Sequence, residues 1–416
     1  MNLLALLSTA QFLYLLVSVA HAGTLTKNGD VCTVSPSDDG SDDTPAILSA
    51  FAECSQDATI VIDKGTFNIE TVMETVGLQN VTVDLRGTLL WSTNITYWRG
   101  AGLPLNYLNM TSAWVFGGSD ITFNGNGYGT FDGQGQVWYD FADGAGNVAG
   151  RPISLIIANT TNSRFTGIRF VQSQFWTMAI TQSENLLLDH IYVNSTSNSS
   201  ASTLNTDGVD TFFSNNITFR YWSVTNGDDS ISQKANSSNI LIQDCVFYNG
   251  NGIAVGSIGQ YNDTYEFITN VTAERVVAIN TVWAGYIKTW TGEVEGYPPN
   301  GGGGGIGYAS NITFRDFAIA NLTNGVTEIT QCISYNGDTG GCGTSTFAIS
   351  DYTFESVFGT ISGGSLANLY CSNNAPCPGI DLDFANVVTN GTRNLTCSNV
   401  VNPDFECTGP AYYSPY

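Results

Sequence analysis

Similar short stretches recur along the chain, and this repetition limits the possible folds more than any other feature of the sequence. Each stretch begins with a small polar residue and an Asn or Asp. Alternating β-branched or aromatic residues follow, which is the pattern of a strand with one buried face. The stretches are LQNVTVDL from residue 78, SDITFNG from 119, SENLLLDHI from 183, SNNITFRYW from 214, SSNILIQDC from 237, ITNVTAERV from 268 and SNITFRDF from 310.

The Asn residues of five stretches set the period of the repeat. They lie 31, 23, 31 and 41 residues apart, at positions 185, 216, 239, 270 and 311. A coil of just over twenty residues with insertions explains these gaps, and such a period indicates stacked repeats. Because no amphipathic helices separate the strands, we predict an all-β fold, a single-stranded parallel β-helix (solenoid). An ordinary β-sandwich is the alternative.

A solenoid needs a cover at each open end. The segment from Thr44 and Pro45 to Cys54 reads as a short capping helix for the N-terminal end, with Asp43 or Thr44 as its cap. Nine cysteines suggest four local disulfides and leave Cys245 as a buried free thiol. The suggested pairs, three of which would stiffen the C-terminal part, are Cys32–Cys54, Cys332–Cys342, Cys371–Cys377 and Cys397–Cys407.

The first 22 residues are apolar and end in Ala20-His21-Ala22, which is typical of a secretory signal peptide, residues 1–22. A single membrane anchor is the alternative, although the stretch is short for a span. We therefore expect a secreted, extracellular protein with one catalytic domain, residues 23–416. Fourteen N-x-S/T sequons fit a glycoprotein. They begin at Asn80, Asn94, Asn109, Asn159, Asn194, Asn198, Asn216, Asn236, Asn262, Asn270, Asn311, Asn321, Asn390 and Asn394.

Charge excludes some classes of partner. The chain has 13 Lys and Arg against 36 Asp and Glu, a formal net charge of −23, so nucleic acid is not an expected partner. No second long apolar stretch follows the first, so we expect no membrane partner. Beyond the signal peptide, His190 is the one histidine, which excludes Ser-His-Asp catalysis and histidine zinc sites. We expect no metal and no cofactor.

Carboxylate chemistry remains. Asp207 lies 21 and 22 residues before Asp228 and Asp229, which is about one coil. Equivalent positions on neighbouring coils stack about 4.8 Å apart, so the three acids should gather on one face. Crowded carboxylates cannot all ionise easily, and a protonated acid beside an ionised base is what glycoside hydrolysis requires. Simple Asp turns and a calcium site are the alternatives.

Two later segments should lie on the same face, residues 249–261 and 285–290. Long insertions, residues 259–267 and 291–307, follow them and would wall one side of a cleft. A blocked end favours the removal of terminal sugars over cleavage within a chain. Four aromatic residues on these segments could stack on sugar rings, with core packing as the alternative for the tryptophan. They are Tyr261, Tyr286, Trp290 and Tyr297.

Four motifs resemble glycoside hydrolase family 28, the polygalacturonase family of right-handed parallel β-helices. They are NTD at 205–207, GDD at 227–229, GIAVGS at 252–257 and IKTW at 287–290. The stretch GSIGQY at 256–261 and the glycine run at 301–305 resemble its exo-acting fungal branch. The resemblance implies an inverting enzyme in which carboxyl groups stand about 6.5–9.5 Å apart.

The resemblance also implies roles for single residues. Asp228 is similar to the family's general acid, and Asp207 and Asp229 are similar to the pair that activates water. Lys288 is similar to a substrate-binding lysine. We expect the positions Tyr286, Asn251, Gln260 and Tyr261 to bind substrate as well.

The sequence departs from the family pattern at three positions, of which the missing histidine bears on the support of the acids, the missing arginine on specificity and the missing cysteine on a local disulfide. Asn251 stands where the family has a histidine, Tyr286 where it has an arginine, and Ser230 where it has a cysteine. Tyrosine cannot replace the charge and the two parallel hydrogen bonds with which arginine binds a carboxylate.

We expect an exo-acting pectin hydrolase that removes terminal galacturonate from galacturonan or rhamnogalacturonan. An α-L-rhamnosidase of rhamnogalacturonan is the first alternative. Calcium-dependent β-elimination and a non-catalytic carbohydrate-binding β-helix are more distant ones. We further expect a monomer that binds a pectic substrate and has an acidic pH optimum, because acid reduces the repulsion between an anionic enzyme and an anionic polymer.

Overall fold

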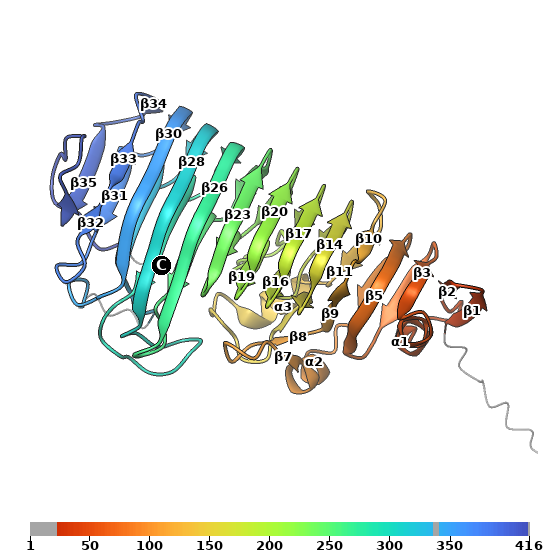
Figure 1. The fold of residues 1–416 in the computed structure, drawn as a ribbon. Helices are drawn as coiled ribbons and strands as arrows, with labels where there is room; N and C mark the ends of the chain where they lie inside the picture. The colour runs from red at the N-terminus through yellow and green to blue at the C-terminus, as the bar shows by residue number, and fades with distance from the viewer. Residues whose placement is uncertain (1–22, 336–340, 415–416) are drawn as a thin grey trace, which may run out of the picture.

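The computed structural model describes residues 23–335 and 341–414. The expected signal peptide therefore lies outside the described residues. The chain forms an elongated solenoid of stacked coils, coloured from red at the N-terminal end to blue at the C-terminal end in Figure 1. Nearly all strand pairings are parallel. The predicted all-β, parallel β-helix fold is confirmed, and the β-sandwich alternative is wrong.

The coils build three parallel ladders of strands. The first, which we call the cleft sheet, contains β9 (Trp114–Ser119), β13 (Leu155–Ala158), β16 (Met178–Thr181), β19 (Asp210–Phe212), β22 (Asp229–Gln233), β25 (Gly252–Ile258), β27 (Gly285–Trp290), β29 (Thr327–Ile333), β31 (Ser365–Tyr370) and β35 (Asn394–Ser398).

The second ladder contains the longest strands. It comprises β2 (Val31–Ser35), β3 (Gln56–Ile62), β5 (Met73–Leu85), β10 (Thr122–Asn124), β14 (Thr161–Thr166), β17 (Glu184–Asp189), β20 (Asn215–Arg220), β23 (Ser237–Gln243), β26 (Tyr265–Ile279), β28 (Ile306–Leu322), β30 (Ala348–Ile361) and β33 (Ile380–Leu382). At the N-terminal end, β1 (Thr24–Asn28) pairs antiparallel with β2.

The third ladder is made of shorter strands, which the far halves of β26, β28 and β30 continue. Its separate strands are β4 (Thr66–Ile69), β6 (Thr88–Trp91), β11 (Thr130–Asp132), β15 (Arg169–Val171), β18 (Tyr192–Asn194), β21 (Ser223–Asn226), β24 (Val246–Asn249) and β34 (Asn386–Thr389). Two small sheets lie outside the ladders. They contain β7 (Leu103–Pro104), β8 (Thr111–Ser112) and β12 (Pro152–Ile153), and β32 (Cys377–Pro378) and β36 (Val400–Val401).

The expected Asn anchors mark equivalent points of successive coils. All five have left-handed backbone, with φ between 55° and 57°, a conformation that Asn tolerates better than most residues. Their side-chain amides bond from coil to coil. For example, Asn216 Nδ2 donates to Asn185 Oδ1 at 2.7 Å, and Asn270 Nδ2 donates to Asn239 Oδ1 at 3.0 Å. The repeat therefore sets the register of the coils.

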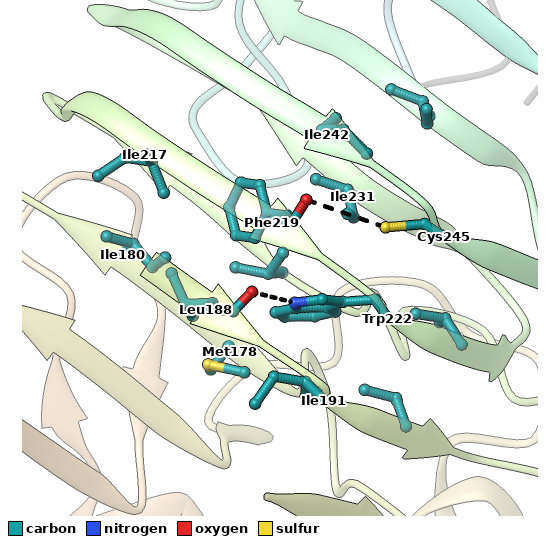
Figure 2. Packing of buried hydrophobic residues seen from close by; sticks show 14 of the residues in the cluster. Met178, Ile180, Leu188, Ile191, Ile217, Phe219, Trp222, Ile231, Ile242 and Cys245 are labelled. Carbon is teal, nitrogen blue, oxygen red and sulfur yellow. Dashed lines mark hydrogen bonds between the residues drawn. The ribbon is translucent and has the colours of Figure 1, made fainter. Parts of the chain in front are cut away.

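Inward-facing side chains fill the solenoid in layers. Figure 2 shows Ile217 and Phe219 of β20 packed between residues of the neighbouring coils. The Phe219 ring meets the buried Trp222 ring edge to face, with centroids 5.4 Å apart. The indole of Trp222 donates to the carbonyl of Leu188 at 2.9 Å, so its polar atom is satisfied inside the core. Cys245 is buried in the same layer and has no disulfide partner.

The predicted capping helix is present as α1 (Thr44–Glu53) and packs Phe51 against Trp114 at the N-terminal end. Its capping differs from the expectation, because Asp43 makes no side-chain cap bond. The Asp43 carboxylate instead accepts from the backbone of Ser37 and Asn68 and ties the helix to the first coils. The four disulfides join the pairs that the sequence suggests: Cys32–Cys54, Cys332–Cys342, Cys371–Cys377 and Cys397–Cys407.

Two short helices that the sequence analysis does not predict, α2 (Ile95–Ala101) and α3 (Gln136–Ala142), lie in insertions between coils. In Figure 1 they lie with β7 and β8 along one side of the solenoid. Twelve of the fourteen sequon Asn residues are exposed, and Asn194 and Asn236 are half-buried. Within residues 23–335 and 341–414, no helix has the length and apolar character to span a membrane.

Candidate active site

The three predicted acids meet at the start of two neighbouring strands of the cleft sheet. Asp207 precedes β19, and Asp228 and Asp229 stand where β22 begins. A backbone bond holds the two turns in register, since Gly208 N donates to Asp229 O at 2.9 Å. Acids that are one coil apart in the sequence thus lie side by side in the structure.

The acids form a tight cluster. One carboxylate oxygen from each of Asp207, Asp228 and Asp229 lies within 4.8 Å of the others, and all three side chains are buried. Coil stacking brings Asp207 to the other two acids, because equivalent positions on adjacent coils are only about 4.8 Å apart, and Asp228 and Asp229 are consecutive residues on one coil.

Burial and mutual repulsion change the protonation of this cluster. Burial raises the pKa of Asp207 well above its usual range, and the neighbouring Asp228 raises it further. Burial also raises the pKa of Asp228, followed by repulsion from Asp229, while Lys288 acts in the opposite direction. The cluster therefore retains a proton at a pH where an exposed aspartate would have lost it.

Neighbouring amides hold the Asp228 carboxylate in place. Asn205 donates to Asp228 Oδ2 from its backbone nitrogen at 3.0 Å, and Asn251 Nδ2 donates to Asp228 Oδ1 at 3.0 Å. The amide of Asp229 donates to Oδ1 as well, at 2.9 Å. Asn251, which stands at the position of the family histidine, thus orients the acid and also lines the cavity.

A tyrosine and a lysine hold Asp229. The hydroxyl of Tyr286 donates to Asp229 Oδ1, and Lys288 Nζ donates to Asp229 Oδ2 and to the Tyr286 hydroxyl, both at 3.0 Å. Burial works to lower the pKa of Lys288, but the Asp229 charge outweighs it and the pKa is raised. Lys288 is therefore a cation, and it lies against a buried carboxylate.

The structure does not place two of the predicted substrate-binding residues on the wall of the cavity. Tyr286 is fully buried in the cleft sheet and contacts Asp229 instead. Tyr261 directs its hydroxyl to the carbonyl of Tyr107 and packs on that ring. Trp290 is also buried, against Tyr335, so core packing describes it. Tyr297 is exposed.

A cavity of about 780 Å³ opens above the acids. All three acids line it, and so do the predicted residues Asn251, Gln260 and Lys288. The sequence analysis missed several other lining residues, which include Tyr107, Leu108, Met110, Trp176, Lys234 and Tyr335. Lys234 carried a usable signal, because it lies six residues after Asp228, and residues an even number apart along a strand point to the same face.

A second buried ion pair lies beside the acids. Lys234 Nζ is 3.3 Å from Asp210 Oδ1. Asp210 begins β19, and Lys234 directly follows β22. Burial raises the pKa of Asp210 to about 7, against the opposing effect of Lys234. The Lys234 ammonium also lies 5.5 Å from the ring centre of Trp176. Both lysines of the cavity are therefore paired with buried carboxylates.

The cleft is closed on the side of the N-terminal coils. There the outward face of the cleft sheet is apolar, with Ile156 of β13 and Ala179 of β16. The insertion at 102–110 lies over this face and packs Leu105, Leu108 and Met110 onto it. Leu108 and Met110 also line the cavity. The acids therefore stand in a pocket that is blocked at one end.

Comparison with known proteins agrees with this geometry. The sequence model of the glycosyl hydrolases family 28 matches residues 54–407. The chain is 44% identical over 387 residues to the alpha-L-rhamnosidase rgxB of Aspergillus niger, covering 91% of this chain and 90% of that one. It is 34% identical over 443 residues to a putative galacturan 1,4-alpha-galacturonidase A of Aspergillus niger, covering 98% and 99%.

Solved structures give the same result for the fold. The endo-xylogalacturonan hydrolase of Aspergillus tubingensis has a TM-score of 0.76 at 25% identity, over 92% of this chain and 99% of that one. The polygalacturonase of Erwinia carotovora has a TM-score of 0.64 at 19% identity, over 93% and 100%. With the family match across most of its length, the chain belongs to glycosyl hydrolase family 28 and is a glycoside hydrolase.

Proposed function

We propose that the protein is a secreted, exo-acting pectin hydrolase that removes terminal α-L-rhamnose from rhamnogalacturonan. The blocked pocket supports removal of a terminal sugar, because a chain that continued past the wall would meet Leu108 and Met110. Release of galacturonate, the sugar that the sequence analysis put first, is the second candidate.

The charge distribution in the pocket is the main observation that supports a neutral sugar as the substrate. Among the described lining residues the cations are Lys234 and Lys288, and each lies against a buried aspartate. A galacturonate in the pocket would need a cation for its carboxylate, and Tyr286 stands where the family has an arginine. A neutral sugar has no such requirement.

The apolar wall supports rhamnose in particular. Rhamnose is a 6-deoxy sugar and carries a methyl group where galacturonate carries a carboxylate. Leu108, Met110 and Trp176 present apolar surface to the cavity, and a buried carboxylate there would lose its hydration without gaining a partner. The 44% identity to a rhamnosidase, against 34% and less to the galacturonidases, favours the same choice.

In the proposed mechanism, Asp228 gives its proton to the glycosidic oxygen as the bond to the terminal sugar breaks. Asp207 and Asp229 take a proton from the water that attacks the sugar carbon from the other face, which inverts its configuration. Asn205 and Asn251 orient the acid. Lys288 and Tyr286 hold Asp229.

We also propose that residues 1–22 are a signal peptide and that residues 23–416 act as one catalytic domain in a monomer. Four disulfides and fourteen sequons, twelve of them exposed, support an extracellular glycoprotein.

The protonation of the acid cluster predicts how the rate depends on pH. Asp228 is active only with its proton, and a raised pKa keeps that proton to a higher pH than usual. As pH rises through this pKa the acid is lost and kcat should fall. Repulsion between the anionic enzyme and an anionic polymer also grows with pH, so we expect the maximum on the acid side of neutrality. Initial rates measured between pH 3 and pH 8, in steps of about one pH unit, test this expectation. A maximum at or above neutrality would contradict it.

Tyr286→Phe tests the support of Asp229. We expect kcat to fall about tenfold, because the carboxylate loses one hydrogen bond to a charged acceptor. KM should change little, since Tyr286 does not line the cavity. Tyr352→Phe is the matched control, because Tyr352 is also fully buried and bonds Thr327 through its hydroxyl, away from the cavity. An unchanged kcat in the Tyr286 variant would refute the role.

The identity of the released sugar tests the function. We expect reducing-end-labelled rhamnogalacturonan oligosaccharides that end in rhamnose to release rhamnose, and oligogalacturonates to be poor substrates. Asp228→Asn should lower the rate about 100-fold or more without loss of oligosaccharide binding, while Asp381→Asn, a change at an exposed acid, should leave it unaltered. Galacturonic acid as the main product would support the second candidate. Release of neither sugar by folded protein would refute exo-hydrolysis.

A further inference from the structure

We propose that Tyr107 and Glu266 form a tie that holds the end wall of the pocket and thereby limits the enzyme to a single terminal sugar. This inference rests on the proposed function, because it explains why hydrolysis stops at the chain end. The two residues are 159 positions apart in the sequence, and the hydroxyl of Tyr107 donates to Glu266 Oε1.

Glu266 occupies a position that a strand normally gives to an apolar residue. It lies on β26, two residues before the core residue Ile268, and is 1% exposed. Its two oxygens have separate partners, since Oε2 accepts from the Gly259 backbone at 3.1 Å. A buried carboxylate costs stability unless such bonds satisfy it. Both partners belong to segments that wall the pocket, so the buried carboxylate joins these segments to each other.

Tyr107 connects the tie to the segment that closes the cleft. Its neighbour Leu108 lines the cavity and packs on the apolar face of the N-terminal coils. The Tyr107 ring also contacts Phe212, Phe213 and Tyr261, with centroids 5.1–5.2 Å apart, and its carbonyl accepts from the Tyr261 hydroxyl. The ring is thus fixed from several sides.

The tie extends to a third segment through Gln260. The side-chain amide of Gln260 donates to Pro299 O at 3.0 Å and to Gly301 O at 2.8 Å, and Gly303 N donates to Gln260 O at 2.7 Å. Pro299 lines the cavity too. Because Glu266 anchors Gly259, it positions Gln260 and, through it, the glycine-rich segment. One carboxylate therefore connects three segments that wall the pocket.

Among the hydrogen bonds of the described residues, none joins the acid cluster to this tie, so its loss should change which substrates fit more than it changes the chemistry. We expect Tyr107→Phe and Glu266→Ala to loosen the wall and admit a sugar attached beyond the terminal rhamnose. The matched control is Tyr265→Phe, a change at the residue next to Glu266, which is 60% exposed.

The experiment compares two oligosaccharides. One ends in rhamnose, and the other carries one further sugar on that rhamnose. We expect the ratio of kcat/KM for the capped over the uncapped substrate to rise about tenfold or more in both tie variants and to stay unchanged in the control. A wild-type ratio in folded tie variants would overturn the proposal. An equal loss on both substrates, with a lower melting temperature, would also overturn it, because it would show a structural role only.

The result can be separated from the fate of the proposed function. If the wild-type enzyme releases galacturonate rather than rhamnose, the rhamnose assignment fails, and the same ratio is measured with capped and uncapped galacturonate-terminated oligosaccharides. A tenfold rise in that ratio would then support the tie, and an unchanged ratio would overturn it.

Discussion

The parallel pairing of one coil on the next is the interaction on which the rest of the structure depends. It converts a distance along the sequence into a distance in space, since residues one coil apart come to lie side by side. Asp207 reaches Asp228 and Asp229 in this way, and backbone bonds such as Gly208 N to Asp229 O fix their relative height. The same pairing leaves one oxygen of each carboxylate within 4.8 Å of the others, so crowding is built into the site.

Crowded acids explain how the cations of the pocket are used. Lys288 lies against Asp229, and Lys234 lies against Asp210. Both lysines compensate buried aspartates, so under the proposed function the sugar is recognised by amides, aromatic rings and apolar side chains. Together with a tyrosine at the position of the family arginine, this pairing supports the proposal of a neutral terminal sugar.

Features that depend on local or repeated sequence could be predicted. The Asn anchors predicted the coils, the NTD and GDD motifs predicted the acid cluster, and short cysteine spacings suggested the four disulfides. The wall of the pocket could not be predicted, because Tyr107 and Glu266 meet only through the path of long insertions. Tyr286 was expected to touch substrate, since a motif shows that a residue belongs to a site but not toward which neighbour it points.

The central claim is that this pocket selects a neutral terminal sugar. Calorimetric titration of the inactive Asp228→Asn variant with two short oligosaccharides, identical except for a terminal rhamnose or a terminal galacturonate, tests it most directly. The account predicts that the rhamnose-terminated ligand binds about tenfold tighter or more, a difference of about 1.4 kcal/mol. Equal affinity, or tighter binding of the galacturonate-terminated ligand, would contradict it.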